Sequence, residues 1–408
     1  MKQINISAPS KLYTSTALPA SKSICNRALI INALSTHSIY PENLSDCDDT
    51  DVIVKALKNM TYTIDIKAAG TAMRFLTSYL AVGKEQHVIT GTERMKQRPI
   101  SILVNALRLL GANIEYTEQE GFPPLKISGK TLTGGKIELK GNVSSQYISS
   151  LLLIAPTLKE GLQIRLTGEV VSVPYINMTL RLMNEFGAQA AWTSEKEIKV
   201  WPKPYKAIPY TIENDWSAAS YWYEMAALAD DAEIELPGLL PNSLQGDSQV
   251  ARLFHYLGVT TEYTGTGIII RNGGERVKRL NYNFVNEPDL AQTFVVTCCL
   301  QNIAFRFTGL QSLKIKETDR MAALINEMKK LGYVVNESDD AVLEWNGERC
   351  EPDAAIAIDT YEDHRMAMAF APAAIRIKGI GIRHPEVVSK SYPGYWNELK
   401  KCGFELKE

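Results

Sequence analysis

A short phrase recurs along the chain and constrains its fold more than any other feature of the sequence. In each copy an amphipathic helix ends, a glycine follows, and a short strand of β-branched or aromatic residues begins. The glycines stand 71 to 76 residues apart, at Gly111, Gly187, Gly258, Gly332 and Gly403. Glycine takes the left-handed conformation that closes a helix, so the strand can turn back onto the core.

A sixth, degenerate copy without the glycine covers residues 54–60. Six copies in 408 residues give a unit of about 68 residues, which exceeds the ~20–50-residue period of solenoids and propellers. Each unit can therefore hold two helices and several strands. Helix–glycine–strand phrases also arise by chance in α/β proteins, but the regular spacing favours an α/β chain built by repetition.

Composition narrows the range of partners. Lys and Arg number 44 and Asp and Glu 46, a formal net charge of −2, whereas binding to nucleic acid or an acidic membrane needs a basic surplus. The longest apolar run, residues 151–156, is too short to span a bilayer. The N-terminus lacks the apolar core of a secretory signal, so we expect a cytoplasmic protein. The six cysteines form no C-x-x-C pair and no zinc pattern with histidine, so we expect no metal.

Three segments of the first half place cations or open backbone at predicted helix starts. Ser23 and Arg27 lie four residues apart on one helix face, with Lys22 in the first turn. Gly70 stands at a turn into a helix, where bare N–H groups can approach an anion. Arg98 ends a cationic loop before a proline that starts a helix, and it could meet an anion in a bidentate way. Solvated charges on capped helices are the ordinary alternative for each segment alone.

Residues 141–147 carry hydroxyl and amide groups into the apolar run 148–155. Hydroxyl and backbone N–H groups at a helix start suit a phosphate or a sugar-like hydroxyl. The side chains concerned are Ser144, Ser145 and Gln146.

Acids and bases are interleaved in the second half. Glu317 stands between Lys316 and Arg320, and a carboxylate between two cations stays ionised until substrate changes its surroundings, so it could exchange a proton during turnover. A surface ion-pair ladder is the alternative. Asp289 precedes an apolar run and is either a helix N-cap or a base. Arg365 adjoins an apolar helix and needs a charged partner if buried, which makes it a candidate anion ligand.

The cations of these segments form one set when they are counted together. They are Lys22, Arg27, Arg98, Lys316, Arg320, Arg365 and Lys390, accompanied by the carboxylates Asp289 and Glu317. This set indicates an enzyme for two small anions with acid–base chemistry between them. A non-catalytic anion-binding repeat protein is the alternative from another class, but it would need no acid–base pair.

In this order the segments resemble the 5-enolpyruvylshikimate-3-phosphate (EPSP) synthase family. The resemblance runs from residues 18–23 to 390–393 and is densest at 95–100, 141–146, 316–320 and 363–368. It implies a two-domain inside-out α/β barrel of six βαβαββ units, three per domain, with the active site in the inter-domain cleft. The C-terminal-half domain would comprise 1–18 and 214–408, and the N-terminal-half domain 19–213.

The resemblance also implies the residues that bind two substrates. Shikimate 3-phosphate would contact Lys22, Ser23, Arg27, Ser144, Ser145, Gln146, Ser172, Tyr175, Asp289, Ser312 and Lys316. Phosphoenolpyruvate would contact Lys22, Gly70, Arg98, Gln146, Arg320, Arg365 and Lys390. No cofactor and no macromolecular partner is implied, and we expect a monomer.

The implied reaction is an addition followed by an elimination, in the shikimate pathway of aromatic amino acid biosynthesis. The 5-hydroxyl of shikimate 3-phosphate attacks C2 of phosphoenolpyruvate while the methylene carbon is protonated, and the tetrahedral intermediate then loses phosphate. Asp289 would orient the hydroxyl and help to deprotonate it, Glu317 would shuttle the methyl proton, and Lys22 would neutralise charge and transfer protons.

Three positions depart from the family pattern. Ala68 stands where the family has asparagine, which removes an amide contact to phosphoenolpyruvate. Phe75 replaces the proline of an Arg-Pro-Leu phrase and alters how the helix of Gly70 meets the pocket. Ser312 stands where many members have asparagine, and its shorter side chain binds the substrate phosphate through water or leaves that contact to others.

A sister family that transfers enolpyruvyl to a UDP-linked amino sugar is the nearest enzyme alternative. It shares the six-unit fold but usually carries a cysteine in a mobile loop at the phosphoenolpyruvate site. Residues 95–99 contain no cysteine, so the sequence favours the shikimate family.

Overall fold

All five glycines of the repeated phrase adopt left-handed backbone conformations in the computed structural model, which describes residues 2–408. Their φ angles run from +83° at Gly187 to +98° at Gly111. Four of the glycines lie between a helix and the strand that follows it, and Gly258 is the second residue of its strand. In chain order the pairs of helix and strand are α5 (Ser101–Leu109) and β5 (Asn113–Tyr116), α7 (Val173–Glu185) and β9 (Ala190–Ser194), α9 (Val250–His255) and β12 (Leu257–Tyr263), α11 (Arg320–Lys330) and β16 (Asn336–Ser338), and α13 (Tyr395–Lys401) and β20 (Glu405–Lys407). The predicted helix–glycine–strand phrase is confirmed at all five positions.

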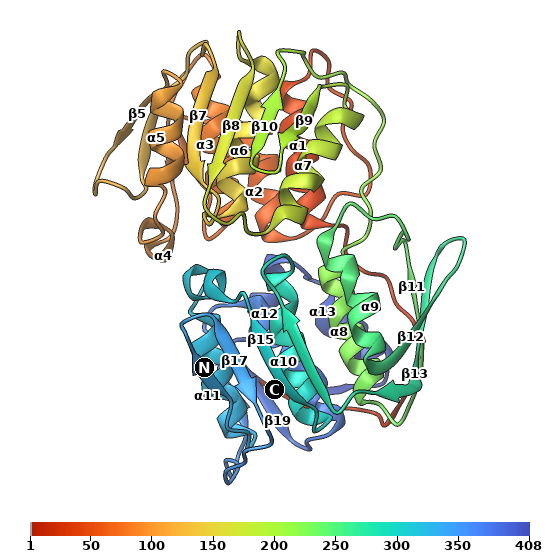
Figure 1. The fold of residues 1–408 in the computed structure, drawn as a ribbon. Helices are drawn as coiled ribbons and strands as arrows, with labels where there is room; N and C mark the ends of the chain where they lie inside the picture. The colour runs from red at the N-terminus through yellow and green to blue at the C-terminus, as the bar shows by residue number, and fades with distance from the viewer. Residues whose placement is uncertain (1) are drawn as a thin grey trace. The chain divides into compact units, whose positions relative to one another are not determined.

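The chain divides into two compact units. The chain up to Pro19 and Glu213–Glu408 form one, which we call the split unit, and Ala20–Ile212 form the other, the inserted unit (Figure 1). No helix within residues 2–408 has the length and apolar character needed to cross a membrane.

Three four-stranded sheets belong to the split unit. The strand order of the first sheet is β18 (Ala357–Ile358), β19 (Ile380–Arg383), β1 (Gln3–Ser7) and β20. The order of the second sheet is β12, β13 (Gly267–Arg276), β11 (Asp231–Pro237) and β2 (Lys11–Ser15). The order of the third sheet is β14 (Arg279–Asn283), β15 (Ala304–Thr308), β17 (Val342–Trp345) and β16. The N-terminal strands complete two of these sheets, because β1 pairs antiparallel with β19 and β20 while β2 pairs parallel with β11. The N-terminal segment is therefore structurally part of the C-terminal half.

The inserted unit contains two such sheets. Their orders are β3 (Thr63–Asp65), β4 (Gln86–Thr90), β6 (Leu125–Ser128) and β5, and β7 (Gly135–Lys140), β8 (Leu162–Thr167), β10 (Glu197–Val200) and β9. Each of the five sheets in residues 2–408 has one parallel pair, such as β7 with β8, followed by two antiparallel pairs. The same supersecondary unit is thus repeated.

The sixth unit keeps its helices, α1 (Lys22–Leu34) and α2 (Asp48–Lys58), but its sheet is reduced to one parallel bridge between Glu42 and Thr211. This is the copy that lacks the glycine in sequence. Helix α2 ends at Asn59 with φ of −130°, and the next strand, β3, already belongs to the neighbouring sheet. No local strand is therefore left to complete the sixth sheet.

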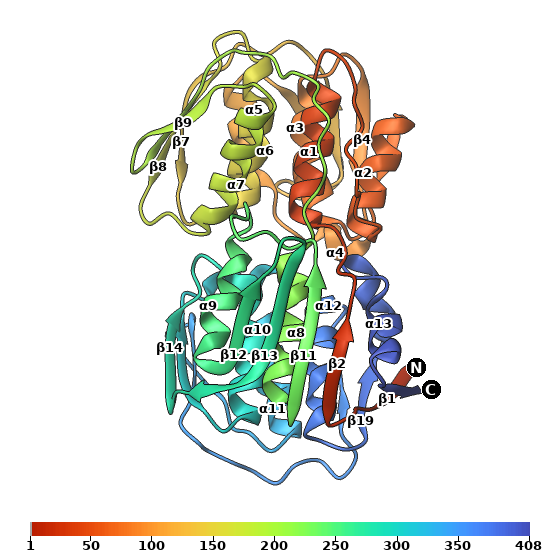
Figure 2. The ribbon, with the colours of Figure 1, turned by 90° about the vertical axis from the view of Figure 1, so that its right-hand side faces the viewer.

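Each unit contains several helices, and some of them, such as α6 (Ser145–Ile154) and α12 (His364–Phe370), are buried along nearly their whole length. The inserted unit contains α1, α2, α3 (Gly70–Ala81), α4 (Glu93–Lys96), α5, α6, η1 (Ala155–Thr157) and α7; the split unit contains α8 (Trp216–Leu228), η2 (Gly246–Gln249), α9, η3 (Pro288–Leu290), α10 (Ala291–Leu300), η4 (Gln311–Ile315), α11, α12, η5 (Ala371–Ile375), η6 (Pro385–Lys390) and α13. Helices α8 and α10 pack on each other and are buried along nearly their whole length. Figure 2 shows the sheet of β2, β11, β13 and β12 against α8.

Burial of α8 places one acid inside this helical core. Glu224 is fully buried, and neither of its carboxyl oxygens has a hydrogen-bond partner among residues 2–408. Burial raises the pKa of Glu224 well above its ordinary value, and the neighbouring Thr297 opposes this shift only in part. The Thr297 hydroxyl instead donates to the carbonyl of Thr293 at 2.7 Å. Burial of Glu224 therefore favours its neutral form.

We expect this acid to make the chain less stable as the pH rises. The folded state retains the proton to a higher pH than the unfolded state, so above the unfolded pKa of about 4.3 the free energy of unfolding falls by up to about 1.4 kcal/mol per pH unit. Glu224→Gln mimics the neutral acid and escapes this loss. Urea unfolding of both proteins between pH 4.5 and 8 should give a difference that grows with pH. The exposed Glu275→Gln on β13 is the control, and a pH-independent difference for Glu224→Gln would contradict the neutral acid.

Candidate active site

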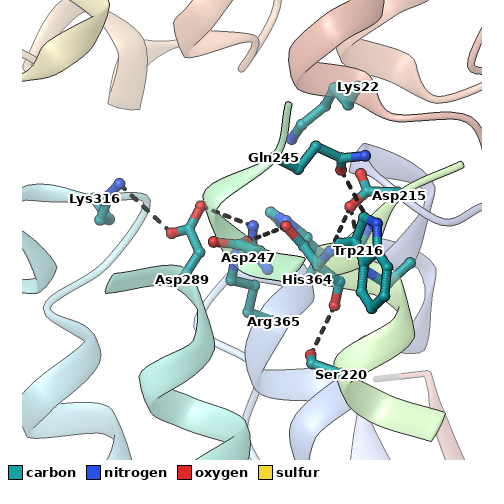
Figure 3. A network of polar contacts seen from close by, with 12 residues as sticks. Lys22, Asp215, Trp216, Ser220, Gln245, Asp247, Asp289, Lys316, His364 and Arg365 are labelled. Carbon is teal, nitrogen blue, oxygen red and sulfur yellow. Dashed lines mark hydrogen bonds and ion pairs between the residues drawn. The ribbon is translucent and has the colours of Figure 1, made fainter. Parts of the chain in front are cut away.

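In the split unit, Asp289 lies between three cations. Its Oδ1 is 3.6 Å from Lys316 Nζ and 2.9 Å from Arg320 Nη1, and its Oδ2 is 2.8 Å from Arg365 Nη2. Figure 3 shows Lys316 and Arg365 reaching this carboxylate from different segments. Helix α10 begins at Ala291 with Leu290 in the N-cap position, so Asp289 is not its cap. The structure therefore contradicts the N-cap role predicted for Asp289, and its role as a base stays a prediction.

Arg320 is the second centre of this cluster. Its side chain is 2% exposed, and its Nε lies 2.7 Å from Oδ2 of the fully buried Asp363. Its Nη2 donates to Glu317 Oε2 at 2.9 Å. Burial alone would lower the pKa of Arg320, but Asp363, Glu317 and Asp289 raise it overall. Arg320 is therefore a charged guanidinium that carboxylates hold on three sides, and its direction is fixed.

Two aspartate caps place the arginines in first helical turns. Asp319 accepts from the backbone N–H groups of Met321 and Ala322 at 3.1 Å, so α11 begins at Arg320. Asp363 accepts from the N–H of Arg365 at 2.9 Å at the start of α12. Such caps satisfy N–H groups that the helix leaves open.

Lys316 and Glu317 therefore precede helix α11, in the segment that follows η4. Lys316 and Arg320 are four residues apart and would share a face of a continuous helix, but the chain breaks between η4 and α11, so they do not. Ser312 lies half-buried in η4, the turn that leads to Lys316. Lys390, at the end of η6, donates from Nζ to the carbonyl of Glu362 at 2.8 Å.

Sequence reasoning missed two buried residues of this cluster. Tyr221 on α8 accepts from Arg365 Nη1 at 3.3 Å, and burial raises the pKa of its phenol to about 12. Asp247 in η2 accepts a short hydrogen bond from the Ser217 hydroxyl. Burial, and then the nearby charge of Asp289, raise the pKa of Asp247 to about 7. The only sequence signal for Asp247 is an acid after glycine ahead of a helix, which is equally typical of an N-cap.

In the inserted unit, α1 carries the predicted basic residues. Ser21 is its N-cap, and Lys22 Nζ lies 3.1 Å from Asp49 Oδ2. Arg27 is 2% exposed and donates to Thr179 Oγ1 at 2.7 Å, to Ser149 Oγ at 3.2 Å and to the carbonyl of Ser23 at 2.8 Å. These partners are neutral, and burial lowers the pKa of Arg27 to about 10. Its positive charge remains available to an anion.

Two further contacts link Arg27 to its surroundings. Its guanidinium carbon lies 5.3 Å from the ring centroid of Phe75, the residue that departs from the family pattern, so the aromatic ring supports the cation. Tyr175, in the first turn of α7, lies close enough to act on Arg27 electrostatically. Ser172 occupies the N-cap position of α7 with φ of +54°.

Arg98 approaches the first residue of α3. A Cβ added to Gly70 would lie 2.6 Å from Arg98 Nη1, so only bare backbone admits the guanidinium at this distance. Arg98 stands between α4 and α5, and α5 begins at Ser101 rather than directly at the proline. The sequence prediction of a helix start here is correct within two residues.

Hydroxyl and amide groups open α6 as the sequence predicts. Ser144 is the N-cap and accepts from the N–H of Gln146 at 3.4 Å, while Ser145 is the first residue of the helix. The Gln146 side chain donates to Thr71 Oγ1 on α3 at 3.1 Å. These groups and Arg27 make the inserted unit suited to anion and hydroxyl recognition, whereas the split unit pairs cations with acids. Within residues 2–408, no group of three or more His, Cys, Asp or Glu side chains is placed to hold a metal ion.

Comparisons of the sequence and of the structure with known proteins all point to one family. The chain matches the family model of EPSP synthase (3-phosphoshikimate 1-carboxyvinyltransferase) over residues 61–399. A 3-phosphoshikimate 1-carboxyvinyltransferase of Bacteroides fragilis is 64% identical over 402 residues and covers 98% of each chain. One from Vibrio atlanticus is 34% identical over 431 residues, which cover 98% of this chain and 99% of that protein. A solved EPSP synthase from Acinetobacter baumannii has 22% identity, full coverage of both chains and a TM-score of 0.79, a likeness in fold.

Proposed function

The chain belongs to the EPSP synthase family, and we propose that it transfers the enolpyruvyl group of phosphoenolpyruvate to the 5-hydroxyl of shikimate 3-phosphate, releasing phosphate. It is a transferase of the shikimate pathway, and the predicted family and α/β fold are confirmed. The observation that carries the proposal is the Asp289 cluster, in which one carboxylate meets three cations and a second carboxylate, Glu317, shares Arg320.

We propose that Asp289 receives the proton of the attacking hydroxyl. The three neighbouring cations keep Asp289 ionised, and a bound anion that offsets their charge increases the affinity of this carboxylate for a proton. Glu317 has 21% of its side chain exposed, so a substrate can approach it, and we assign to it the exchange of a proton with the methylene carbon. Lys22, paired with Asp49 at 3.1 Å, would neutralise developing charge and transfer a proton.

For phosphoenolpyruvate, two of the proposed ligands are charged groups whose directions are fixed. Arg320 and Arg365 are held by carboxylates before any anion arrives, so little reorganisation is needed in the transition state. The remaining proposed ligands are Lys22, Gly70, Arg98, Gln146 and Lys390.

For shikimate 3-phosphate, the proposed ligands combine hydroxyls with charge. Buried Arg27, with only neutral partners in its hydrogen bonds, is suited to the phosphate. The others are Lys22, Ser23, Ser144, Ser145, Gln146, Ser172, Tyr175, Asp289, Ser312 and Lys316. Ser312 would reach the phosphate through water because its side chain is short.

Several general features of the enzyme are part of the same proposal. It works in the cytoplasm as a monomer, and it uses no cofactor and no partner other than its two substrates. Its two domains divide near residues 18–19 and 213–214. Size-exclusion chromatography with light scattering tests the monomer.

Phosphate release from phosphoenolpyruvate tests the function directly. The assay is run with shikimate 3-phosphate and, separately, with a UDP-linked amino sugar as acceptor. Turnover with shikimate 3-phosphate alone is expected. Turnover only with the UDP-sugar, or with neither acceptor, would overturn the proposal.

Gly70→Ala is expected to raise KM for phosphoenolpyruvate by about tenfold or more, because losing one charged hydrogen bond has that scale. The new Cβ would stand 2.6 Å from Arg98 Nη1 and displace the guanidinium. KM for shikimate 3-phosphate should change little. The control is Gly394→Ala, where an added Cβ meets no atom within 4 Å. Equal KM values for Gly70→Ala and wild type would remove Arg98 from the proposed site.

A further inference from the structure

The turn ahead of Asp363 has an uncommon backbone. Tyr361 and Glu362 have φ of +53° and +56°, a left-handed conformation that is unfavourable for residues with a Cβ. The buried hydroxyl of Thr360, which precedes them, has no hydrogen-bond partner among residues 2–408. Such a turn persists only where its surroundings hold it.

Glu327 on α11 holds one side of this turn. The Tyr361 hydroxyl donates to its Oε1 at 2.7 Å, and the N–H of Asp359 donates to its Oε2 at 3.0 Å. Lys330 Nζ lies 2.8 Å from the same Oε2 and 2.7 Å from Asp359 Oδ2. Glu327 is itself fully buried, so a rigid helix fixes the turn through its acid.

The other side of the turn reaches the proposed site. Lys390 Nζ donates to the carbonyl of Glu362 at 2.8 Å, and the N–H of Asp363 donates to the carbonyl of Thr360 at 2.8 Å. The Asp363 carboxylate is in turn 2.7 Å from Arg320 Nε. One short turn therefore sets the positions of Lys390 and of the Asp363–Arg320 pair.

We propose that Glu327 and Tyr361 are positioning residues, which hold the left-handed turn in place and thereby direct Lys390 and Arg320 toward a bound anion. Neither residue has a role in the substrate contacts proposed above. The identity of that anion as phosphoenolpyruvate rests on the proposed function, whereas the placement of Lys390 rests on contacts within the split unit.

Tyr361→Phe removes the hydroxyl that donates to Glu327, and Glu327→Gln weakens its acceptor. Each is expected to raise KM for phosphoenolpyruvate by about tenfold, the scale of one hydrogen bond to a charged group, while KM for shikimate 3-phosphate stays the same. A purely structural role would lower the melting temperature and the yield of active enzyme without this selective change in KM. An unchanged KM for phosphoenolpyruvate in both variants would overturn the inference.

Rescue by glycine separates strain in the turn from loss of the tyrosine itself. Glu362→Gly keeps the carbonyl that Lys390 uses and takes the left-handed conformation without penalty. In the Tyr361→Phe background it should bring KM for phosphoenolpyruvate back toward the wild-type value. Asp339→Gly is the matched control, because Asp339 also has φ of +54° but lies in the turn between β16 and β17. Failure of Glu362→Gly to rescue, or equal rescue by Asp339→Gly, would contradict the role of the turn.

A measurement that needs no turnover distinguishes this inference from the proposed function. The rate at which acetic anhydride modifies Lys390, followed by mass spectrometry relative to exposed Lys400, reports the contact with Glu362. In Tyr361→Phe and Glu327→Gln it should rise about three- to tenfold, the range for one lost hydrogen bond. An unchanged rate overturns the inference even in an active enzyme. A raised rate in a protein that does not use shikimate 3-phosphate supports the turn and overturns the proposed function alone.

Discussion

Replacing Glu317 by glutamine is expected to lower kcat by about 10²- to 10⁴-fold, the scale of a general acid or base, while shikimate 3-phosphate still binds. Glutamine has the shape of glutamate, and its carbonyl oxygen can accept the bond that Arg320 Nη2 donates at 2.9 Å. Its amide does not exchange a proton with carbon, so the substitution removes the proton transfer and leaves the geometry. Steady-state phosphate release measures kcat, and titration calorimetry measures substrate binding.

The control for Glu317→Gln is Glu337→Gln in the same unit. Glu337 lies 2.6 Å from Lys314 Nζ, and a partly exposed pair of this kind contributes little, so kcat should stay within about twofold of wild type. Near-normal turnover of Glu317→Gln would show that another group shuttles the methyl proton. Loss of shikimate 3-phosphate binding together with kcat would show that Glu317 acts in binding.

Asp363→Ala is expected to lower the free energy of unfolding by about 3–5 kcal/mol, the cost of breaking a buried ion pair. Asp363 is 0% exposed and is 2.7 Å from Arg320 Nε. Its removal leaves Arg320 buried with fewer opposite charges, and desolvation of that guanidinium is no longer fully offset. Urea unfolding, with the midpoint and the slope both reported, measures the loss.

Two further variants separate the ion pair from the helix cap. Asp319→Ala removes a cap of the same kind from α11, and this alone should cost about 0.5–2 kcal/mol. Asp363→Asn keeps an oxygen that can accept from the N–H of Arg365, but it loses the charge that faces Arg320. It should therefore fall between the two alanine variants. If Asp363→Ala costs no more than Asp319→Ala, the buried pair adds nothing beyond the cap.

The repeat shows which parts of the fold can be predicted from the sequence. Glycine positions such as Gly111 and Gly187 are predicted correctly because a left-handed helix end is a steric property of one residue and its neighbours. The reduced sixth sheet is different. A bridge joins Glu42 to Thr211 there, and such a long-range pairing depends on the segments that come to lie beside each other.

The same distinction between local and long-range contacts applies to the residues of the proposed site. Aspartate before a helix start placed Arg320 and Arg365 in first turns through local caps, and the basic character of these segments was visible without a structure. The residues that pair with these two arginines could not be predicted from the sequence. Arg320 meets Asp363 across 43 positions of the chain, and Arg365 meets Tyr221 across 144.

Steric limits and helix capping act over a few neighbouring residues, so the repeated α/β units, the glycine helix ends and a set of cations at helix starts could be predicted from the sequence. Which carboxylate faces which cation, and which acids are buried away from solvent, depends on how distant segments pack. Asp289 acquired three cations, Asp247 a pKa of about 7, and the turn at Tyr361 its support from Glu327. Desolvation and charge pairing depend on segments distant in the chain, and only packing brings those segments together.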